Sequence, residues 1–100
     1  MVQVDLFYGE SIADRKFREF HEKNPWVYKE LVALAWQAHE RGRKRIGIKM
    51  LIEVVRWART LQTRGDVYKI NNNYAPRYAR KIMEEYPELD GLFNLRDLRT

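Results

Sequence analysis

Basic residues are the side chains whose type and spacing best support a chemical function in this sequence. Residues 41–81 contain twelve Lys and Arg against two acids, a net charge of +10, whereas residues 1–40 and 82–100 are net −2 and −3. Positive charge concentrated between two mildly acidic ends is typical of a surface that binds a polyanion. The alternative is a solvated basic surface without a partner.

The densest part of this segment has four cations within five residues, Arg41, Arg43, Lys44 and Arg45. They fall between two predicted helices, where side chains that project from a turn can reach phosphates without loss of core packing. Interaction with the dipole of the preceding helix explains one or two of these charges but not four. The cluster therefore predicts phosphate contacts.

A second basic group lies on a helix predicted over residues 74–86. Arg77, Arg80 and Lys81 share one side of that helix because they are three and four residues apart. Arg pairs bidentately with guanine and Asn with adenine, so this composition favours groove recognition in duplex DNA, although Asn is also a frequent cap and turn former. The residues predicted to face the groove are Asn72, Asn73, Tyr74, Arg77, Arg80 and Lys81. Because Arg77 and Arg80 leave the side opposite the apolar residues, their removal is expected to change recognition and not the core.

Groups suited to catalysis or metal binding are scarce. The absence of Cys removes disulfides, thiolate nucleophiles and sulfur-ligated metals. The one serine, Ser11, is explained as a helix cap, and His21 and His39 have no second ligand at i+3 or i+4. The sequence therefore predicts no catalysis, no metal and no cofactor. A small nuclease would need convergent carboxylates, and only Glu53 and Asp66 lie in the basic segment.

Length and composition indicate one domain over residues 1–100, with residues 1–10 as an arm or a short strand. Hydrophobic residues make up 45% of the chain and charged residues 33%, enough for a single core with a charged surface. No apolar run is long enough to span a membrane, and the N-terminus lacks a basic region followed by an apolar one. We therefore expect a cytoplasmic protein that does not bind a membrane.

Apolar residues at helical spacing predict a mainly α fold with helices over residues 11–22, 25–41, 47–63 and 74–86. Ser11, Asn24 and Gly42 are expected to cap helix ends. The third helix is apolar on two faces, which predicts a central position. The residues predicted to be buried are Leu31, Leu34, Leu51, Ile52, Val55, Trp57 and Ile82.

The order of these elements resembles a winged helix-turn-helix protein. Helices 25–41, 47–63 and 74–86 would be its three helices, and the run Gly91-Leu92-Phe93-Asn94-Leu95-Arg96 would open its wing. The resemblance implies that helix 74–86 enters the major groove and that the wing carries Arg96 and Arg99. The connection from Gly65 to Asn73 is longer than the turn of about three or four residues in that motif. Residues 92–99 suit either a wing strand or a helix.

A second resemblance is to small uncharacterised proteins encoded by bacteriophages and prophages, and it spans about residues 17–99. It is carried by the phrases Phe20-His21-Glu22-Lys23-Asn24-Pro25, Arg45-Ile46-Gly47-Ile48-Lys49, Val55-Arg56-Trp57, Lys69-Ile70-Asn71-Asn72-Asn73-Tyr74 and Tyr78-Ala79-Arg80-Lys81-Ile82-Met83. It implies a phage or bacterial cytoplasmic setting and no established activity.

The sequence therefore predicts a four-helix, helix-turn-helix-like domain that binds nucleic acid without catalysis, with duplex DNA favoured over RNA. The alternative is an interaction protein that binds an acidic host protein. A large exposed apolar surface beside the basic segment would favour that alternative.

Overall fold

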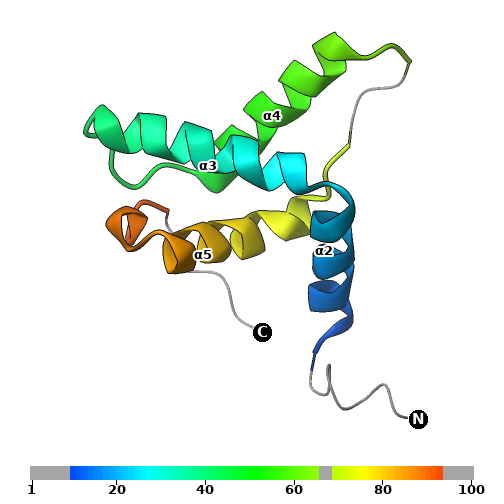
Figure 1. Cartoon of the computed structure of the whole chain (residues 1–100), viewed down its shortest axis with the longest axis horizontal. Coiled ribbons are helices and arrows are strands. Elements are labelled where there is room, and N and C mark those ends of the chain that lie inside the picture. The colour runs from blue at the N-terminus through cyan, green and yellow to red at the C-terminus, as the bar shows by residue number, and fades with distance from the viewer. Residues whose placement is uncertain (1–9, 66–68, 94–100) are drawn as a thin grey trace.

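The computed structural model describes residues 10–65 and 69–93. The helices of this part are α2 (Ile12–Lys23), α3 (Pro25–Glu40), α4 (Ile48–Gln62) and α5 (Ala75–Glu85), with 3-10 turns η1 (Asn72–Tyr74) and η2 (Pro87–Leu89). The predicted mainly α fold with four helices is confirmed, and each helix begins and ends close to its predicted bounds. Figure 1 shows α3 alongside α5, with α2 crossing one end and α4 running outward from α3.

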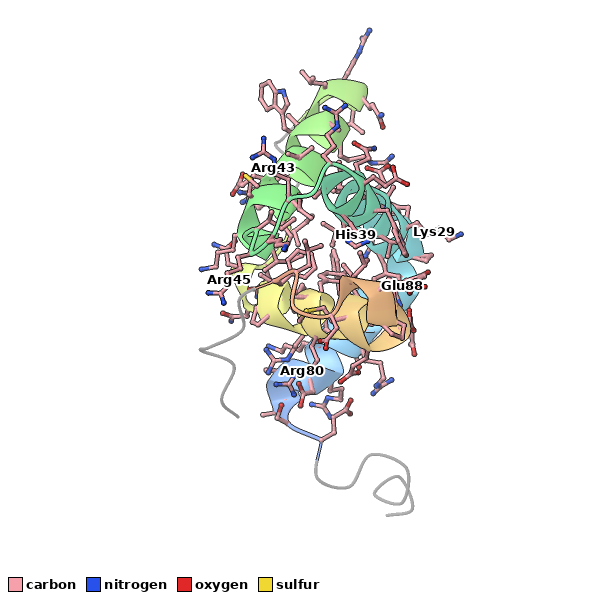
Figure 2. All side chains as sticks on the ribbon, turned by 90° about the vertical axis from the view of Figure 1, so that its left-hand side faces the viewer. Lys29, His39, Arg43, Arg45, Arg80 and Glu88 are labelled. Atoms are coloured by element: carbon pink, nitrogen blue, oxygen red, sulfur yellow. The ribbon has the colours of Figure 1, made fainter. Side chains whose placement is uncertain are left out.

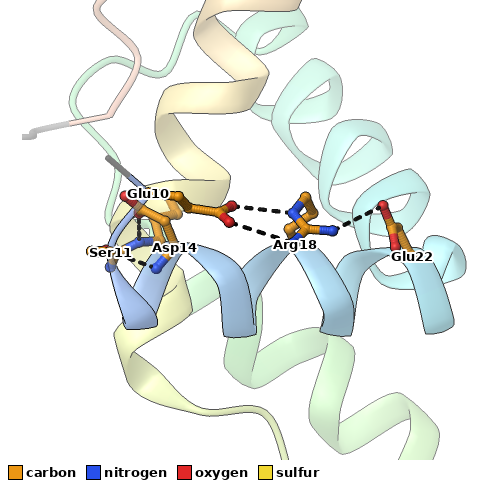
Figure 3. Close-up of polar contacts among 6 residues, drawn as sticks. Glu10, Ser11, Asp14, Arg18 and Glu22 are labelled. Atoms are coloured by element: carbon orange, nitrogen blue, oxygen red, sulfur yellow. Dashed lines mark hydrogen bonds and ion pairs between the residues drawn. The ribbon is translucent and has the colours of Figure 1, made fainter. Parts of the chain in front are cut away.

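The start of α2 follows the predicted capping pattern. The side chain of Ser11 accepts a hydrogen bond of 3.0 Å from the backbone N–H of Asp14. Further along the helix, Arg18 lies between two carboxylates, with its Nε 3.1 Å from Glu10 and its Nη1 3.8 Å from Glu22 (Figure 3). Local side-chain interactions therefore support a helix that has no fully buried residue of its own.

Asn24 lies between α2 and α3, and its side chain acts differently from the prediction. It makes no capping hydrogen bond to α3. Its Nδ2 instead donates to the carbonyl of Phe20 at 3.0 Å, and its backbone N–H donates to the same carbonyl at 2.9 Å. Asn24 thus occupies the predicted N-cap position of α3, but its side chain interacts with the end of α2 and makes no capping hydrogen bond to α3.

The core forms where α3, α4 and α5 meet, and α2 closes one end through aromatic contacts. Phe17 on α2 contacts Tyr78 on α5 edge to face, with ring centroids 4.8 Å apart. Tyr28 on α3 lies 6.3 Å from Tyr78 and donates a hydrogen bond to the carboxylate of Glu85. The largest fully buried side chains are Tyr78, Leu31, Ile52, Ile82, Leu89, Val27 and Val55.

The predicted core is confirmed for most of its residues and wrong for Trp57. Leu31, Leu51, Ile52, Val55 and Ile82 are buried, and Leu34 is half-buried against them. Trp57 is 62% exposed.

Within the described residues, α3 and α5 cover the side of α4 that carries Ile48, Leu51, Ile52 and Val55. The second apolar face of α4 remains exposed, so the predicted central position of this helix is also wrong.

The described chain contains no strand, only one isolated parallel bridge between Ile46 and Phe93. The N–H of Ile46 donates to the carbonyl of Leu92 at 2.9 Å, which ties the α3–α4 connection to the turn after α5. The arm or strand predicted for residues 1–10 lies almost wholly outside the described residues. Residues 94–99 of the predicted wing also lie outside them. No described helix is both long and apolar enough to cross a membrane.

Candidate functional site

The four clustered cations lie on the connection between α3 and α4, which we call the basic loop (residues 41–45). Gly42 has φ +76°, and its N–H donates to the carbonyl of His39. The N–H of Arg43 donates to the carbonyl of Ala38 at 2.9 Å. This pair of bonds is the Schellman arrangement that ends a helix with glycine in the left-handed region. The cap predicted at Gly42 is thus present, and it fixes where the basic loop leaves α3.

Arg45 ends the basic loop in an unusual backbone conformation. Its φ is +58°, and it is the one described residue other than glycine with positive φ. A side chain in this region costs about 1–2 kcal/mol, because Cβ approaches the following carbonyl oxygen. The neighbouring bridge at Ile46 holds the chain in place on the other side. Strained residues of this kind are concentrated at functional sites.

The side chains of the basic loop are available to a ligand. Arg41, Arg43, Lys44 and Arg45 are all exposed, and none forms an ion pair within the described part of the chain. In Figure 2, which looks onto this end of the molecule, Arg45 projects from the edge of the fold. An anion can therefore approach the loop without displacing a partner among the described residues.

A groove of about 230 Å³ runs between the basic loop and the turn that contains η2. One wall carries cations of the loop together with His39, and the other carries the carboxylates of Glu88 and Asp90. Its volume falls below the range of about 300–1,000 Å³ typical of small-molecule sites. With both signs of charge on its walls, the groove favours neither an anionic nor a cationic small ligand.

The side chain of Arg77 on α5 donates hydrogen bonds to two other elements of the fold. Its side chain is 14% exposed, and its Nε donates to Oδ1 of Asp14 on α2 at 2.6 Å. Its Nη1 donates to the carbonyl of Asn73 at 3.0 Å. The hydrogen bond from Arg77 lowers the pKa of the Asp14 carboxyl below its usual value. The sequence does not predict this contact with α2, since helical spacing gives no information on which neighbour reaches a side chain.

The other residues that the sequence predicts to face the groove of duplex DNA differ in their exposure. Arg80, Asn72 and Asn73 are exposed. Lys81 is half-buried and pairs with Glu85 at 3.2 Å.

Tyr74 packs inward, with its ring 5.0 Å from that of Phe20. Asn71 accepts a hydrogen bond from the N–H of Asn73 and so caps η1, which is the capping role that asparagine often takes. Of the residues predicted to face the DNA groove, Asn72 and Asn73 on η1 and Arg80 on α5 are thus the accessible ones.

The exposed apolar side of α4 is a feature whose position the sequence does not reveal. Met50, Val54, Trp57 and Leu61 are between 47% and 67% exposed. The signal is present as a second apolar stripe at helical spacing, but spacing alone does not distinguish an exposed stripe from a buried one. Surface patches of this kind are typical of interaction sites.

Among the described residues, no group of three or more His, Asp or Glu is arranged to hold a metal ion. His21 is half-buried, and burial, with the nearby charge of Lys81, lowers its pKa. Its ring stacks on Phe17 at 6.1 Å and meets Tyr28 edge to face, so it belongs to the aromatic contacts between α2 and the core.

Comparisons of the chain with protein-family models, with curated protein sequences and with solved structures give no match.

Proposed function

We propose that this protein binds nucleic acid, with duplex DNA as the preferred form, through phosphate contacts made by the basic loop. The observation that carries the proposal is the loop itself. Four exposed cations without ion pairs among the described residues lie within five positions, on backbone fixed at both ends. Phosphate contacts of this kind supply most of the affinity in non-specific binding and position a protein on the duplex.

Arg80, Asn72 and Asn73 are accessible on the α5 side and are the proposed contacts to groove edges. Arg77 and Lys81 are engaged by Asp14 and Glu85, so we assign them to the support of α5 rather than to the ligand. The proposed mode is therefore dominated by phosphates, with few base contacts. We further propose that the helices are used in the order of a winged helix-turn-helix protein. The proposal includes a phage or bacterial cytoplasmic setting and no catalytic activity.

The second candidate function is binding to an acidic host protein. The exposed apolar side of α4 favours it, because such a surface beside the basic segment is what this alternative predicts. Titration with nucleic acid distinguishes the two functions.

The test is a fluorescence-anisotropy titration of labelled duplex and single-stranded DNA at several salt concentrations. The variant Arg43→Gln/Lys44→Gln/Arg45→Gln removes three charges from the basic loop. Its matched control, Arg15→Gln/Lys16→Gln/Lys29→Gln, removes three exposed charges from α2 and α3. For the loop variant, the slope of log K against log salt is expected to fall by about 0.9 for each phosphate that the protein no longer neutralises.

The control is expected to retain the slope of the wild type. Equal losses in the two triple variants would mean that only net charge matters and would contradict contact through the loop. Absence of binding by the wild type to either form of DNA at low salt would favour the acidic-protein function instead.

A further inference from the structure

The outward side of α4 carries a continuous apolar stripe. It consists of Met50, Val54, Trp57 and Leu61, which are 56%, 47%, 62% and 67% exposed. With 3.6 residues per turn, these positions lie nearly opposite the buried side of the same helix. Four large apolar side chains over three turns are more than a scattering of single exposed residues.

The spacing of the stripe is that of a helix–helix seam. Its residues are four, three and four positions apart, as in the alternating pattern of a coiled coil. This order reads the same in both directions along the helix. A stripe with that property matches a second copy of itself when the two helices run antiparallel about a two-fold axis.

We infer that α4 pairs with α4 of a second copy of this chain in an antiparallel, two-fold arrangement. Met50 then faces the partner's Leu61, and Val54 faces the partner's Trp57. The second of these pairs sets the smallest side chain of the stripe against the largest, as close packing requires. A parallel arrangement would place Trp57 against its own copy and leave Val54 against Val54.

The residues that flank the stripe favour a second copy over an acidic partner. In the antiparallel arrangement Glu53 lies across from the partner's Thr60, so this pair does not oppose like charges. An acidic helix would be repelled by the exposed carboxylate of Glu53, which lies beside the stripe and pairs with Arg56 on its own helix.

The size of the surface sets the expected strength of the dimer. A standard interface buries about 800 Å² on each partner. One face of a 15-residue helix provides part of that area. In Figure 1 the C-terminal part of α4 extends away from α3 and α5, so a partner helix can lie along it. The expected dimer is therefore a concentration-dependent one, populated in the range of about 10–100 μM.

The experiment is sedimentation equilibrium of the full chain from about 1 to 200 μM. The wild type is expected to shift from monomer to dimer over this range. Met50→Glu and Leu61→Lys are each expected to weaken dimerisation at least tenfold. Because the two positions face each other across the axis, the double variant Met50→Glu/Leu61→Lys is expected to regain dimerisation.

The control is Ile12→Glu, which charges an equally exposed apolar position on α2 and is expected to leave dimerisation unchanged. Circular dichroism establishes that each variant remains helical. A wild type that stays monomeric up to 200 μM would overturn the inference, as would dimerisation that both single variants retain. Failure of the double variant to recover would overturn the antiparallel register. These outcomes are independent of DNA binding, which is measured on dilute protein.

Discussion

Arg77 donates from Nε to Oδ1 of Asp14 at 2.6 Å, and this contact joins residues that are 63 positions apart. It links α5 to the first turn of α2. The same guanidinium donates to the carbonyl of Asn73 in η1, so one side chain holds three elements together. Arg77, which the sequence predicts as a recognition contact, thus also makes contacts between elements of the fold.

Replacing Arg77 with Ala is expected to lower the free energy of unfolding by about 1 kcal/mol, allowing for solvent screening at the half-exposed Asp14. Arg80→Ala is the matched control, because Arg80 is exposed on the same helix, and its expected change is below about 0.5 kcal/mol. Urea denaturation followed by circular dichroism measures both. Equal stability of the two variants would show that the ion pair between Arg77 and Asp14 does not contribute to the free energy of unfolding.

As the pH falls below about 6.5, stability is expected to decrease because of His21. Burial lowers the pKa of His21 in the fold below the 6.5 of the free side chain. The stability that the fold gains by keeping His21 neutral is therefore fully present above pH 6.5, and it is lost as the pH falls through the pKa of His21 in the folded state. Its Nδ1 is buried without a hydrogen-bond partner in the described residues, so His21→Phe is expected to flatten the profile. Thermal unfolding at pH 5, 6 and 7 measures this difference, and an unchanged profile would contradict it.

The two apolar sides of α4 are expected to differ sharply in their contribution to stability. Leu51→Ala removes a buried side chain and is expected to cost about 2–5 kcal/mol. Trp57→Ala removes a larger but exposed one and is expected to cost less than about 0.5 kcal/mol in the monomer. Both are measured by urea denaturation at low micromolar concentration. Similar losses would mean that the outward side of α4 is covered.

Replacing Arg45 with Gly is expected to separate stability from binding. Glycine adopts a φ of +58° without steric cost, so the free energy of unfolding should stay the same or rise by up to about 1 kcal/mol. Removal of the charge should weaken binding to duplex DNA and reduce its salt dependence. Arg45→Gln, which keeps the backbone cost, should weaken binding to a similar extent without the gain in stability. Loss of stability in the glycine variant would contradict the strain argument.

Helix bounds were predictable because local residues set them. Ser11 at the start of α2 and Gly42 at the end of α3 act within one turn of themselves, so their effect can be inferred from sequence alone. The buried side of α4 was only partly predictable. Periodicity identified two apolar sides, but α3 and α5 both pack on the same one.

The candidate site shows the same division. Exposure of the basic loop follows from its position between two helices, which the sequence predicts. The ion pair between Arg77 and Asp14 cannot be predicted in this way, because it depends on where α2 lies relative to α5. That position depends on the long-range aromatic packing of Phe17 on Tyr78.

The two hydrogen bonds that hold the basic loop, from Arg43 to Ala38 and from Ile46 to Leu92, also bear on proteolysis. Each of its four cations is a cleavage site for trypsin, yet a protease needs the chain to leave its folded path. Cleavage there must therefore await local opening of the α3–α4 connection. The rate of trypsin cleavage at residues 41–45 therefore measures how often the α3–α4 connection opens. A bound polyanion would lower that rate.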